Sequence, residues 1–319
     1  MPRKISSLLI AFTIFLVACK KGNNSPASSS KILFSAQVTA TSIVQMFSIN
    51  PDGSELTQVT HFTDFIPLQD MAWSSDHSKI VYNKGAQIFV MNADGSNVVQ
   101  LTDNNTVSYG GRFSPDGRSI VYTTRVASPA GAPYSTTSQL AIMNASTGAG
   151  KTQITNLCTA AYKYRDAEIG TWSPDGSKIA FITIVQNGNG IEIYTINADG
   201  SGLKLIVPDQ YPSSPETLTY SPDGSTLMFQ NFAGTTSIEG AYTASAATGA
   251  NLKFLFSYSV PANSLASMSP SYSPDGSQIV AGSYKDNPKG DLYIVNTDGT
   301  IAKRLTNGGY DLIYNTAWR

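Results

Sequence analysis

An all-β fold made from one repeated unit is predicted by three features of the sequence. A second turn sequence, of the type Asn-x-Asp-Gly or a degenerate version of it, follows each copy of a first turn sequence, Ser-Pro-Asp-Gly, after roughly 20 residues. The segments between these turns are rich in β-branched and aromatic residues, which favour strands. Recurrence of one such unit at intervals of 40–60 residues is typical of a ring of four-stranded blades, the β-propeller. The copies of the first turn are Ser114–Gly117, Ser173–Gly176, Ser221–Gly224 and Ser273–Gly276, with a degenerate copy at Ser74–His77.

The Ser-Pro-Asp-Gly turn joins the first two strands of each unit, which we name A and B. Pro presets φ at the second position of a type I turn, and Gly accepts the left-handed conformation that follows. Each copy follows an aromatic residue and precedes a short apolar run such as Lys178–Phe181. The turn therefore predicts an antiparallel hairpin.

The Asn-x-Asp-Gly turn joins the remaining strands, C and D, as at Asn92–Gly95 and Asn197–Gly200. Strand C is predicted in the segment before this turn, as at Gln87–Met91, Ile191–Ile196 and Asp291–Val295. Each unit is then four strands, and no helix is expected after the N-terminal segment.

Intervals between equivalent positions of the A–B turns are 40, 59, 48 and 52 residues, so the variation must lie in the connections. Because the strands alternate in direction, the A–B and C–D turns share one end of the ring, which we call the turn face. The B–C and D–A connections share the other end, the loop face. The long connections expected there are 125–138, 156–169, 208–216, 257–269 and 307–314.

The two ends of the repeat region complete one blade. Asn315–Arg319 matches strand A up to its aromatic residue, and Lys31–Phe34 matches strand B. Pairing of Thr316–Arg319 with Lys31–Ser35 would close the ring and remove the exposed strand edges. Five full units and this divided one give six blades.

The N-terminus predicts a bacterial lipoprotein. Arg3 and Lys4 precede an apolar stretch too short to span a bilayer, which ends in Leu16-Val17-Ala18-Cys19 and resembles a lipobox. We expect a signal peptide at residues 1–18, a lipidated Cys19 with a polar tether over 19–30, and the propeller over 31–319. Since Lys20 is not Asp, the resemblance implies an outer-membrane destination facing the periplasm.

The aromatic-Ser-Pro-Asp-Gly-Ser-x-Ile signature resembles the WD40-like repeat of TolB-type β-propellers over residues 31–319. TolB itself has an α/β domain ahead of its propeller that is not expected in this chain, so its partners are not carried over. The resemblance implies a six-bladed propeller that serves as a binding module of the cell envelope.

Composition excludes several classes of function. With a net charge of −1 and only 13% charged residues, the chain has no basic surface for nucleic acid. The two histidines, His61 and His77, are expected at opposite ends of the blades, so the three-His metal site of the similar oligogalacturonate lyases cannot form within one chain. The Asp-Gly turns lack the oxygen ligands of a calcium loop. We therefore predict no metal site, no cofactor and no catalytic triad.

The loop face is the predicted binding surface, because irregular loops on a rigid ring are the usual carriers of recognition. Strand A lies innermost, so the residues four positions before its aromatic should surround the mouth of the channel. Tyr-rich and Arg-containing loops surround this mouth, and the turn face is expected to discriminate poorly between ligands. The predicted ligand-binding residues are Gln69, Tyr109, Tyr164, Arg165, Glu168, Glu216 and Tyr314.

These residues favour a non-enzymatic envelope lipoprotein that binds a protein, peptide or glycan through its loop face. The alternative is a hydrolase or lyase acting on polysaccharide with a carboxylate-based site at the same mouth. A third reading is a structural scaffold that bridges partners without a small ligand.

Overall fold

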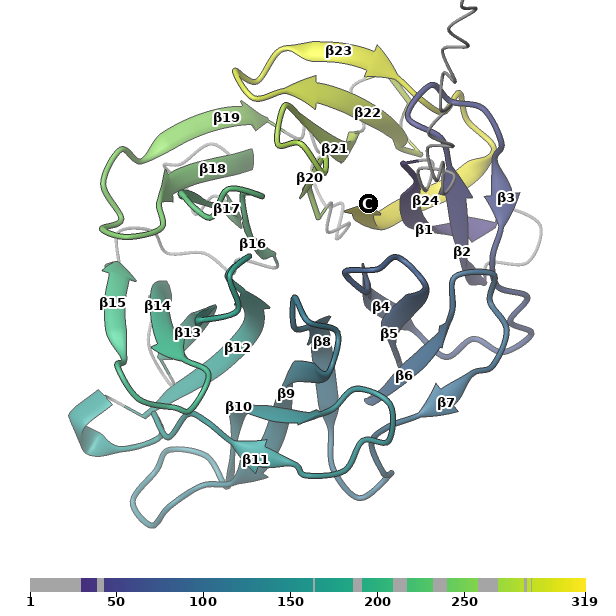
Figure 1. Ribbon diagram of the computed structural model, residues 1–319. Helices are drawn as coiled ribbons and strands as arrows, with labels where there is room; N and C mark the ends of the chain where they lie inside the picture. Colours follow the sequence, from purple (N-terminus) through teal and green to yellow (C-terminus); the bar gives the residue numbers. More distant parts are fainter. Residues whose placement is uncertain are drawn as a thin grey trace, which may run out of the picture.

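The computed structural model is a ring of six four-stranded antiparallel sheets (Figure 1). It describes residues 30–38, 43–162, 164–185, 191–208, 217–231, 240–257, 269–283, 286–287 and 289–319. Within these ranges there is one short 3₁₀ turn, η1 (Ala160–Tyr162), and no helix long and apolar enough to cross a membrane. The predicted six-bladed all-β fold is thereby confirmed.

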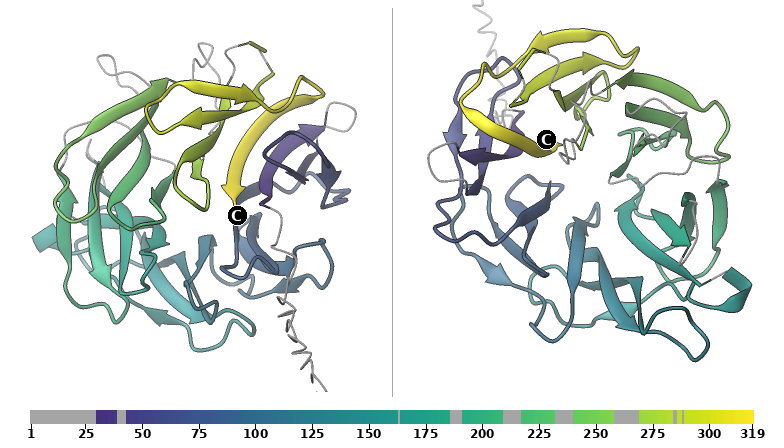
Figure 2. Two further views of the ribbon diagram at one scale, coloured as in Figure 1. Left: turned by 45° about the horizontal axis from the view of Figure 1, so that its top comes forward. Right: turned by 180° about the vertical axis from the view of Figure 1, so that it is seen from behind.

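Every blade runs from an inner strand beside the channel to an outer strand at the circumference (Figures 1 and 2). Blade 1 consists of β24 (Tyr310–Trp318), β1 (Ile32–Val38), β2 (Val44–Ile49) and β3 (Thr57–Gln58). Blade 2 consists of β4 (Leu68–Trp73), β5 (Lys79–Lys84), β6 (Gln87–Asn92) and β7 (Val99–Gln100). Blade 3 consists of β8 (Ser108–Phe113), β9 (Ser119–Ala127), β10 (Thr136–Asn144) and β11 (Thr152–Gln153).

The other three blades repeat this order. Blade 4 consists of β12 (Arg165–Trp172), β13 (Lys178–Val185), β14 (Ile191–Asn197) and β15 (Lys204–Val207). Blade 5 consists of β16 (Leu218–Tyr220), β17 (Thr226–Asn231), β18 (Gly240–Ser245) and β19 (Lys253–Ser257). Blade 6 consists of β20 (Ser271–Tyr272), β21 (Gln278–Ser283), β22 (Asp291–Asn296) and β23 (Ile301–Arg304).

The A–B turns adopt the geometry that their sequence predicts. In blade 4, the amide of Gly176 donates to the carbonyl of Ser173 over 2.9 Å, and Gly176 has φ of 72°. The Asp175 carboxylate accepts from the Ser173 hydroxyl at 2.6 Å and from the Ser177 amide at 3.0 Å. The degenerate copy keeps this fold with His77 at φ of 59°, a strained conformation for a residue with a side chain.

Ring closure follows the predicted pairing and extends beyond it. β24 pairs antiparallel with β1, from Ile32 opposite Trp318 to Val38 opposite Tyr310, with irregularities that include one between Phe34 and Ala36. The buried side chains of this blade, such as Ile32 and Phe34, belong to a core cluster that also contains residues of blades 2 and 6. Closure of blade 1 therefore buries apolar surface against both of its neighbours, blades 2 and 6.

A second repeated contact, which the turn pattern does not predict, fixes the outer strand in four blades. In blade 3, the Thr155 hydroxyl donates to Gln139 Oε1 at 2.8 Å and accepts from the Leu140 amide at 2.9 Å. Equivalent pairs are Gln45–Thr60, Gln87–Thr102 and Asp291–Thr306. The signal was present as a Thr two residues after the Gln or Arg that ends strand D in four blades.

Parts of the predicted loops are strands. The expected connection 125–138 is shorter, because β9 continues to Ala127 and β10 begins at Thr136, paired with each other. Likewise β12 begins at Arg165 and β24 at Tyr310. The expected loops at 208–216 and 257–269 fall almost entirely outside the described residues, as do the signal peptide, Cys19 and most of the tether.

Candidate functional site at the loop-face mouth

Two predicted mouth residues from different blades meet at the loop face. The Tyr109 hydroxyl, from the inner strand of blade 3, donates to Glu168 Oε1 in the inner strand of blade 4 at 2.9 Å. It also lies 3.0 Å from the hydroxyl of Ser138 on β10. The sequence rule that placed these residues four positions before the aromatic is consistent with their register, opposite Thr123 and Ile182 of the neighbouring strands.

Burial controls the acid–base properties of this pair. Removal from water raises the pKa of the Glu168 carboxyl above its ordinary value of 4.5, and the nearby Asp166 charge adds to this. Hydrogen bonds from Tyr109 and Ser138 and the charge of Arg125 oppose the shift. Burial and the Glu168 charge likewise raise the pKa of Tyr109, so its hydroxyl remains a donor. The cluster can thus bind a hydroxyl or cationic group, or exchange a proton.

A second carboxylate lies on the same side of β12, two residues before Glu168. Asp166 accepts from the hydroxyl of Thr137 at 2.6 Å and from the Ser138 amide at 3.0 Å. Successive odd or even positions of a strand share one face, so the two acids and Ser138 form one polar cluster. We call Tyr109, Ser138, Asp166 and Glu168 the mouth cluster.

Bulges with unusual backbone angles follow the mouth residues directly. The ladder of β12 slips between Glu168 and Thr171, with the β-branched Ile169 at φ of 54°. In blade 2 it slips between Gln69 and Met71, with Asp70 at φ of 35°. Such conformations cost of order 1–3 kcal/mol for residues with a side chain, and they concentrate at functional sites.

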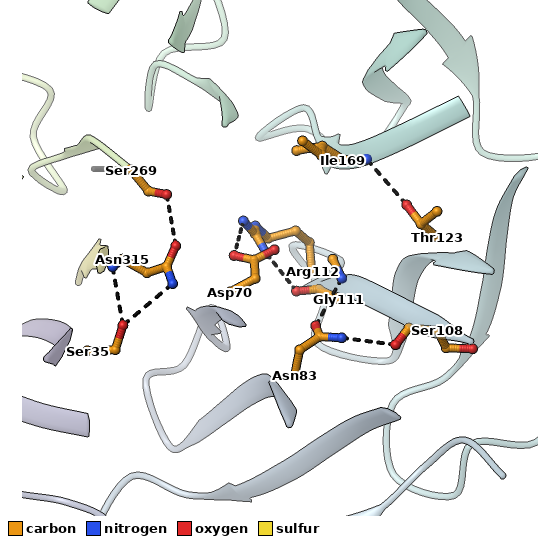
Figure 3. A network of polar contacts seen from close by, with 11 residues as sticks. Ser35, Asp70, Asn83, Ser108, Gly111, Arg112, Thr123, Ile169, Ser269 and Asn315 are labelled. Carbon is orange, nitrogen blue, oxygen red and sulfur yellow. Dashed lines mark hydrogen bonds and ion pairs between the residues drawn. The ribbon is translucent and has the colours of Figure 1, made fainter. Parts of the chain in front are cut away.

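Within the channel, an ion pair joins the inner strands of blades 2 and 3 (Figure 3). Arg112 binds Asp70 through both nitrogens of its fork, at 2.6 and 2.7 Å, and also donates to the carbonyl of Gly111. Neither residue was predicted. The sequence did contain an indication of this pair, because Asp70 and Arg112 are oppositely charged residues within two predicted inner strands, which should face the channel.

Hydrogen bonds across blades stabilise the bulges around this pair. Asn83 of β5 accepts from the Gly110 amide at 2.9 Å and donates to the Ser108 carbonyl at 3.0 Å. The Thr123 hydroxyl accepts from the amide of Ile169 at 3.3 Å, as Figure 3 shows. The strained backbone is therefore held by side chains of the preceding blade.

Arg165 does not lie on the surface as expected. Its side chain is 7% exposed and forms an ion pair with Glu192 at 3.0 Å, and Glu192 also accepts from the Tyr194 hydroxyl. The reason is that Arg165 begins β12 rather than ending a loop. Its guanidinium thus links β12 to β14 within blade 4 through Glu192.

The remaining predicted residues are dispersed. Gln69 is exposed, Tyr164 is half-buried with φ of 52°, and the Tyr314 hydroxyl lies 3.5 Å from Gln37 Oε1. Glu216 falls outside the described residues. The binding roles of all seven predicted residues remain predictions, of which the structure joins Tyr109 and Glu168 directly.

The turn aspartates bond to their own turns, as the sequence predicts. The pKa of each is lowered from the ordinary 3.8, chiefly by the hydroxyl of a neighbouring Ser or Thr, and for Asp76 it falls to about 2. These residues are Asp52, Asp76, Asp94, Asp116, Asp175, Asp199, Asp223, Asp275 and Asp298. Across the part of the chain that the structure describes, no three His, Cys, Asp or Glu residues gather as a metal site.

The turn face carries cavities between neighbouring blades. A cavity of about 430 Å³ opens between the turns of blades 4 and 5, lined by Lys178, Lys204 and Tyr220 among others. A related cavity of about 290 Å³ lies between blades 5 and 6. Equivalent residues of successive blades line the two cavities, with Asp175 and Asp223 in the first and Asp223 and Asp275 in the second.

The fold is a six-bladed β-propeller with four antiparallel strands in each blade. Neither protein-family models nor curated protein sequences match this chain. Among solved structures, TolB from Acinetobacter baumannii is similar with a TM-score of 0.67 and 22% identity, over 91% of this chain and 66% of that one. A putative TolB from Agrobacterium tumefaciens has a TM-score of 0.59 and 16% identity, over 87% and 88% of the two chains.

An enzyme is also among the similar structures. An oligogalacturonate lyase in complex with manganese has a TM-score of 0.53 and 17% identity, over 81% of this chain and 69% of that one. This chain spans just under two thirds of the length of the Acinetobacter TolB. At these identities the similarity establishes the fold, a TolB-type six-bladed propeller, which confirms the resemblance seen in the sequence.

Proposed function

We propose that the protein is a lipid-anchored lipoprotein of the bacterial cell envelope that binds a protein, peptide or glycan through its loop face. The mouth cluster carries this proposal, because it gathers a half-buried acid with a raised pKa, a tyrosine and a serine from two blades at one opening. The similarity to TolB-type propellers supports a partner in the envelope.

Exposed apolar side chains on the loop face extend the proposed contact surface. Phe65 is 75% exposed and Ile66 49% exposed in the connection between blades 1 and 2, and Tyr134 is 52% exposed between β9 and β10. Aromatic residues are enriched in protein interfaces, whereas they are costly to leave in water. The partner would contact these apolar groups around the polar mouth.

Capture of partners from detergent-solubilised envelope tests the binding face. Glu168→Gln and Phe65→Ser should each reduce the amount of captured partner, while the turn-face variant Asp199→Asn should capture as much as the wild type. Equal capture by all three variants would refute a loop-face site. Melting curves of each variant separate loss of binding from loss of folding.

The anchor is tested through Cys19. The thiol is the acceptor of the lipid, so Cys19→Ala should release the protein from the membrane fraction and prevent lipoprotein-type cleavage. A membrane-bound mature form of this variant would show that the predicted lipobox is wrong.

Glu168 also favours one second function, a hydrolase or lyase acting on polysaccharide. A carboxyl whose pKa is raised by burial can act as a general acid, as the acid of many glycosidases does. Purified protein incubated with acidic polysaccharides should then release reducing or unsaturated ends, and Glu168→Gln should abolish this. Absence of any product would leave the binding function as the better account.

A further inference from the structure

Exposed apolar side chains recur at one level around the circumference of the propeller. They lie at, or directly before, the first residues of the outer strands, next to the C–D turns and so next to the turn face. Their exposed fractions range from 38% to 53%. These residues, which we call the apolar rim, are Leu56, Val98, Val99, Leu205, Phe254 and Ile301, from five of the six blades.

Lysines are interleaved with the apolar rim. Lys204 precedes Leu205, and its ammonium group donates to the Ala247 carbonyl of the next blade at 2.7 Å. Lys303 follows Ile301 and donates to the carbonyl of Asp52 in the turn of blade 1. These contacts direct the ammonium groups toward the turns. The turn aspartates of the same face have lowered pKa values and so carry negative charge, which means that the apolar side chains rather than a net positive charge suit this face to the headgroup region of a bilayer.

The tether enters the propeller at the same face. Ser30 precedes β1, which starts at the turn face, and its hydroxyl donates to the carbonyl of Arg319 at 2.7 Å and accepts from the Trp318 indole at 2.7 Å. The Arg319 amide donates in turn to the Lys31 carbonyl at 3.0 Å. Figure 1 shows this end of β24 near the centre of the ring. Ser30, the last residue of the tether, is therefore held at the turn face.

The length of the tether limits how the ring can lie on a membrane. From Cys19 to Ser30 there are 11 residue steps, which span at most about 40 Å when fully extended and about 18 Å at random-coil dimensions. To reach the loop face from Ser30, the tether would have to pass outward over β2 and β3 and then run the length of β1 from the turn face to the loop face. Those distances sum to roughly 33 Å at usual strand spacing and rise. Only a nearly taut tether could bring the loop face to the bilayer.

We infer that the turn face lies against the anchoring membrane, with the apolar rim at headgroup level and the loop face directed away from it. This inference rests on the lipid anchor proposed above. It limits the partner: the mouth cluster receives a molecule from the aqueous compartment or from an opposing layer, not a lipid or protein domain embedded in the anchoring bilayer.

Fluorescence quenching in vesicles tests this orientation. The full lipidated chain is reconstituted into vesicles of phosphatidylethanolamine and phosphatidylglycerol that carry a quencher at the headgroup. Single labels are attached at Ala247→Cys on the turn face or at Ala130→Cys in the loop between β9 and β10, since the native Cys158 is buried. Rim insertion of only about 5–10 Å predicts at least roughly twofold stronger quenching at the turn-face label. Equal quenching, or stronger quenching at Ala130→Cys, would overturn the inference.

Matched substitutions test the apolar rim itself. Leu205→Ser combined with Phe254→Ser should reduce quenching of the turn-face label, whereas Phe65→Ser with Tyr134→Ser on the loop face should leave it unchanged. Full quenching in the rim variant would refute a contact between the rim and the lipid. A second copy as the occupant of the rim would instead appear as a dimer in detergent that the rim variant dissociates, and would also refute it.

Flotation with vesicles and intact mass distinguish failure of the proposed lipid anchor from failure of the proposed orientation. A chain that carries no lipid on Cys19 and does not float with vesicles contradicts the proposed function. A lipidated chain that floats but shows the loop face quenched contradicts the orientation alone.

Discussion

Removal of one hydroxyl from the mouth cluster should destabilise the protein in a pH-dependent way. Tyr109→Phe deletes the donor at 2.9 Å from Glu168 and leaves the ring in place. Loss of a hydrogen bond to a charged, mostly buried group costs about 1.5–3 kcal/mol of folding free energy. The cost should reach this range where Glu168 is ionised, because the carboxylate then lacks its donor.

The sign of the pH dependence follows from the direction of the Glu168 pKa. The pKa is raised in the folded state, so this group favours folding below its unfolded value of 4.5, and that contribution is lost as the pH rises through the folded value. The Tyr109 hydrogen bond lowers this pKa, so its removal raises the folded pKa further. The destabilisation by Tyr109→Phe should therefore be larger near pH 8 than near pH 4.

Urea denaturation at the two pH values measures this difference. The same substitution in a Glu168→Gln background provides the control, because that side chain does not titrate. The pH-dependent part of the cost should vanish there. An equal cost of Tyr109→Phe at both pH values, or pH dependence that persists in the Glu168→Gln background, would refute the reasoning.

Three further perturbations have defined outcomes. Gly299→Ala would place its Cβ 1.9 Å from a backbone carbonyl oxygen at φ of 93°, whereas Gly308→Ala at φ of 78° meets open space. The second should cost about 1 kcal/mol in thermal or urea unfolding, and the first clearly more because the clash adds to the same backbone strain; equal costs would contradict the packing argument. Arg112→Leu should cost about 1–3 kcal/mol because it leaves Asp70 in the channel without its bidentate partner; unchanged urea unfolding would mean that the pair contributes nothing. The lowered pKa of Asp76, about 2, predicts stability that is present above pH 3.8 and lost as the pH falls through 2. Asp76→Ala should make this loss of stability at low pH less steep by the share of one turn carboxylate, and an unchanged pH dependence would count against it.

The sequence alone determined the architecture. The Ser-Pro-Asp-Gly and Asn-x-Asp-Gly turns fix where strands reverse, because only certain residues accept the φ values those turns require. The two incomplete ends, at Lys31 and Trp318, then determine how the ring closes, since each lacks the strand that the other supplies. The same logic identified Tyr109 and Glu168 as equivalent positions near the mouth. Local rules sufficed for the turns because each turn depends on a few adjacent residues, and the repetition of the turns along the chain then determined the ring.

Only the tertiary structure decided which of these positions act together. Tyr109 and Glu168 are 59 residues apart and meet because blades 3 and 4 are neighbours. Arg165 became buried because β12 extends further than the turn pattern indicates. The Asp70–Arg112 pair depends on bulges, which a strand pattern does not encode. Side-chain contacts between blades depend on strand register and on the angle between sheets, and these quantities are set by the packing of the whole ring rather than by any one repeat.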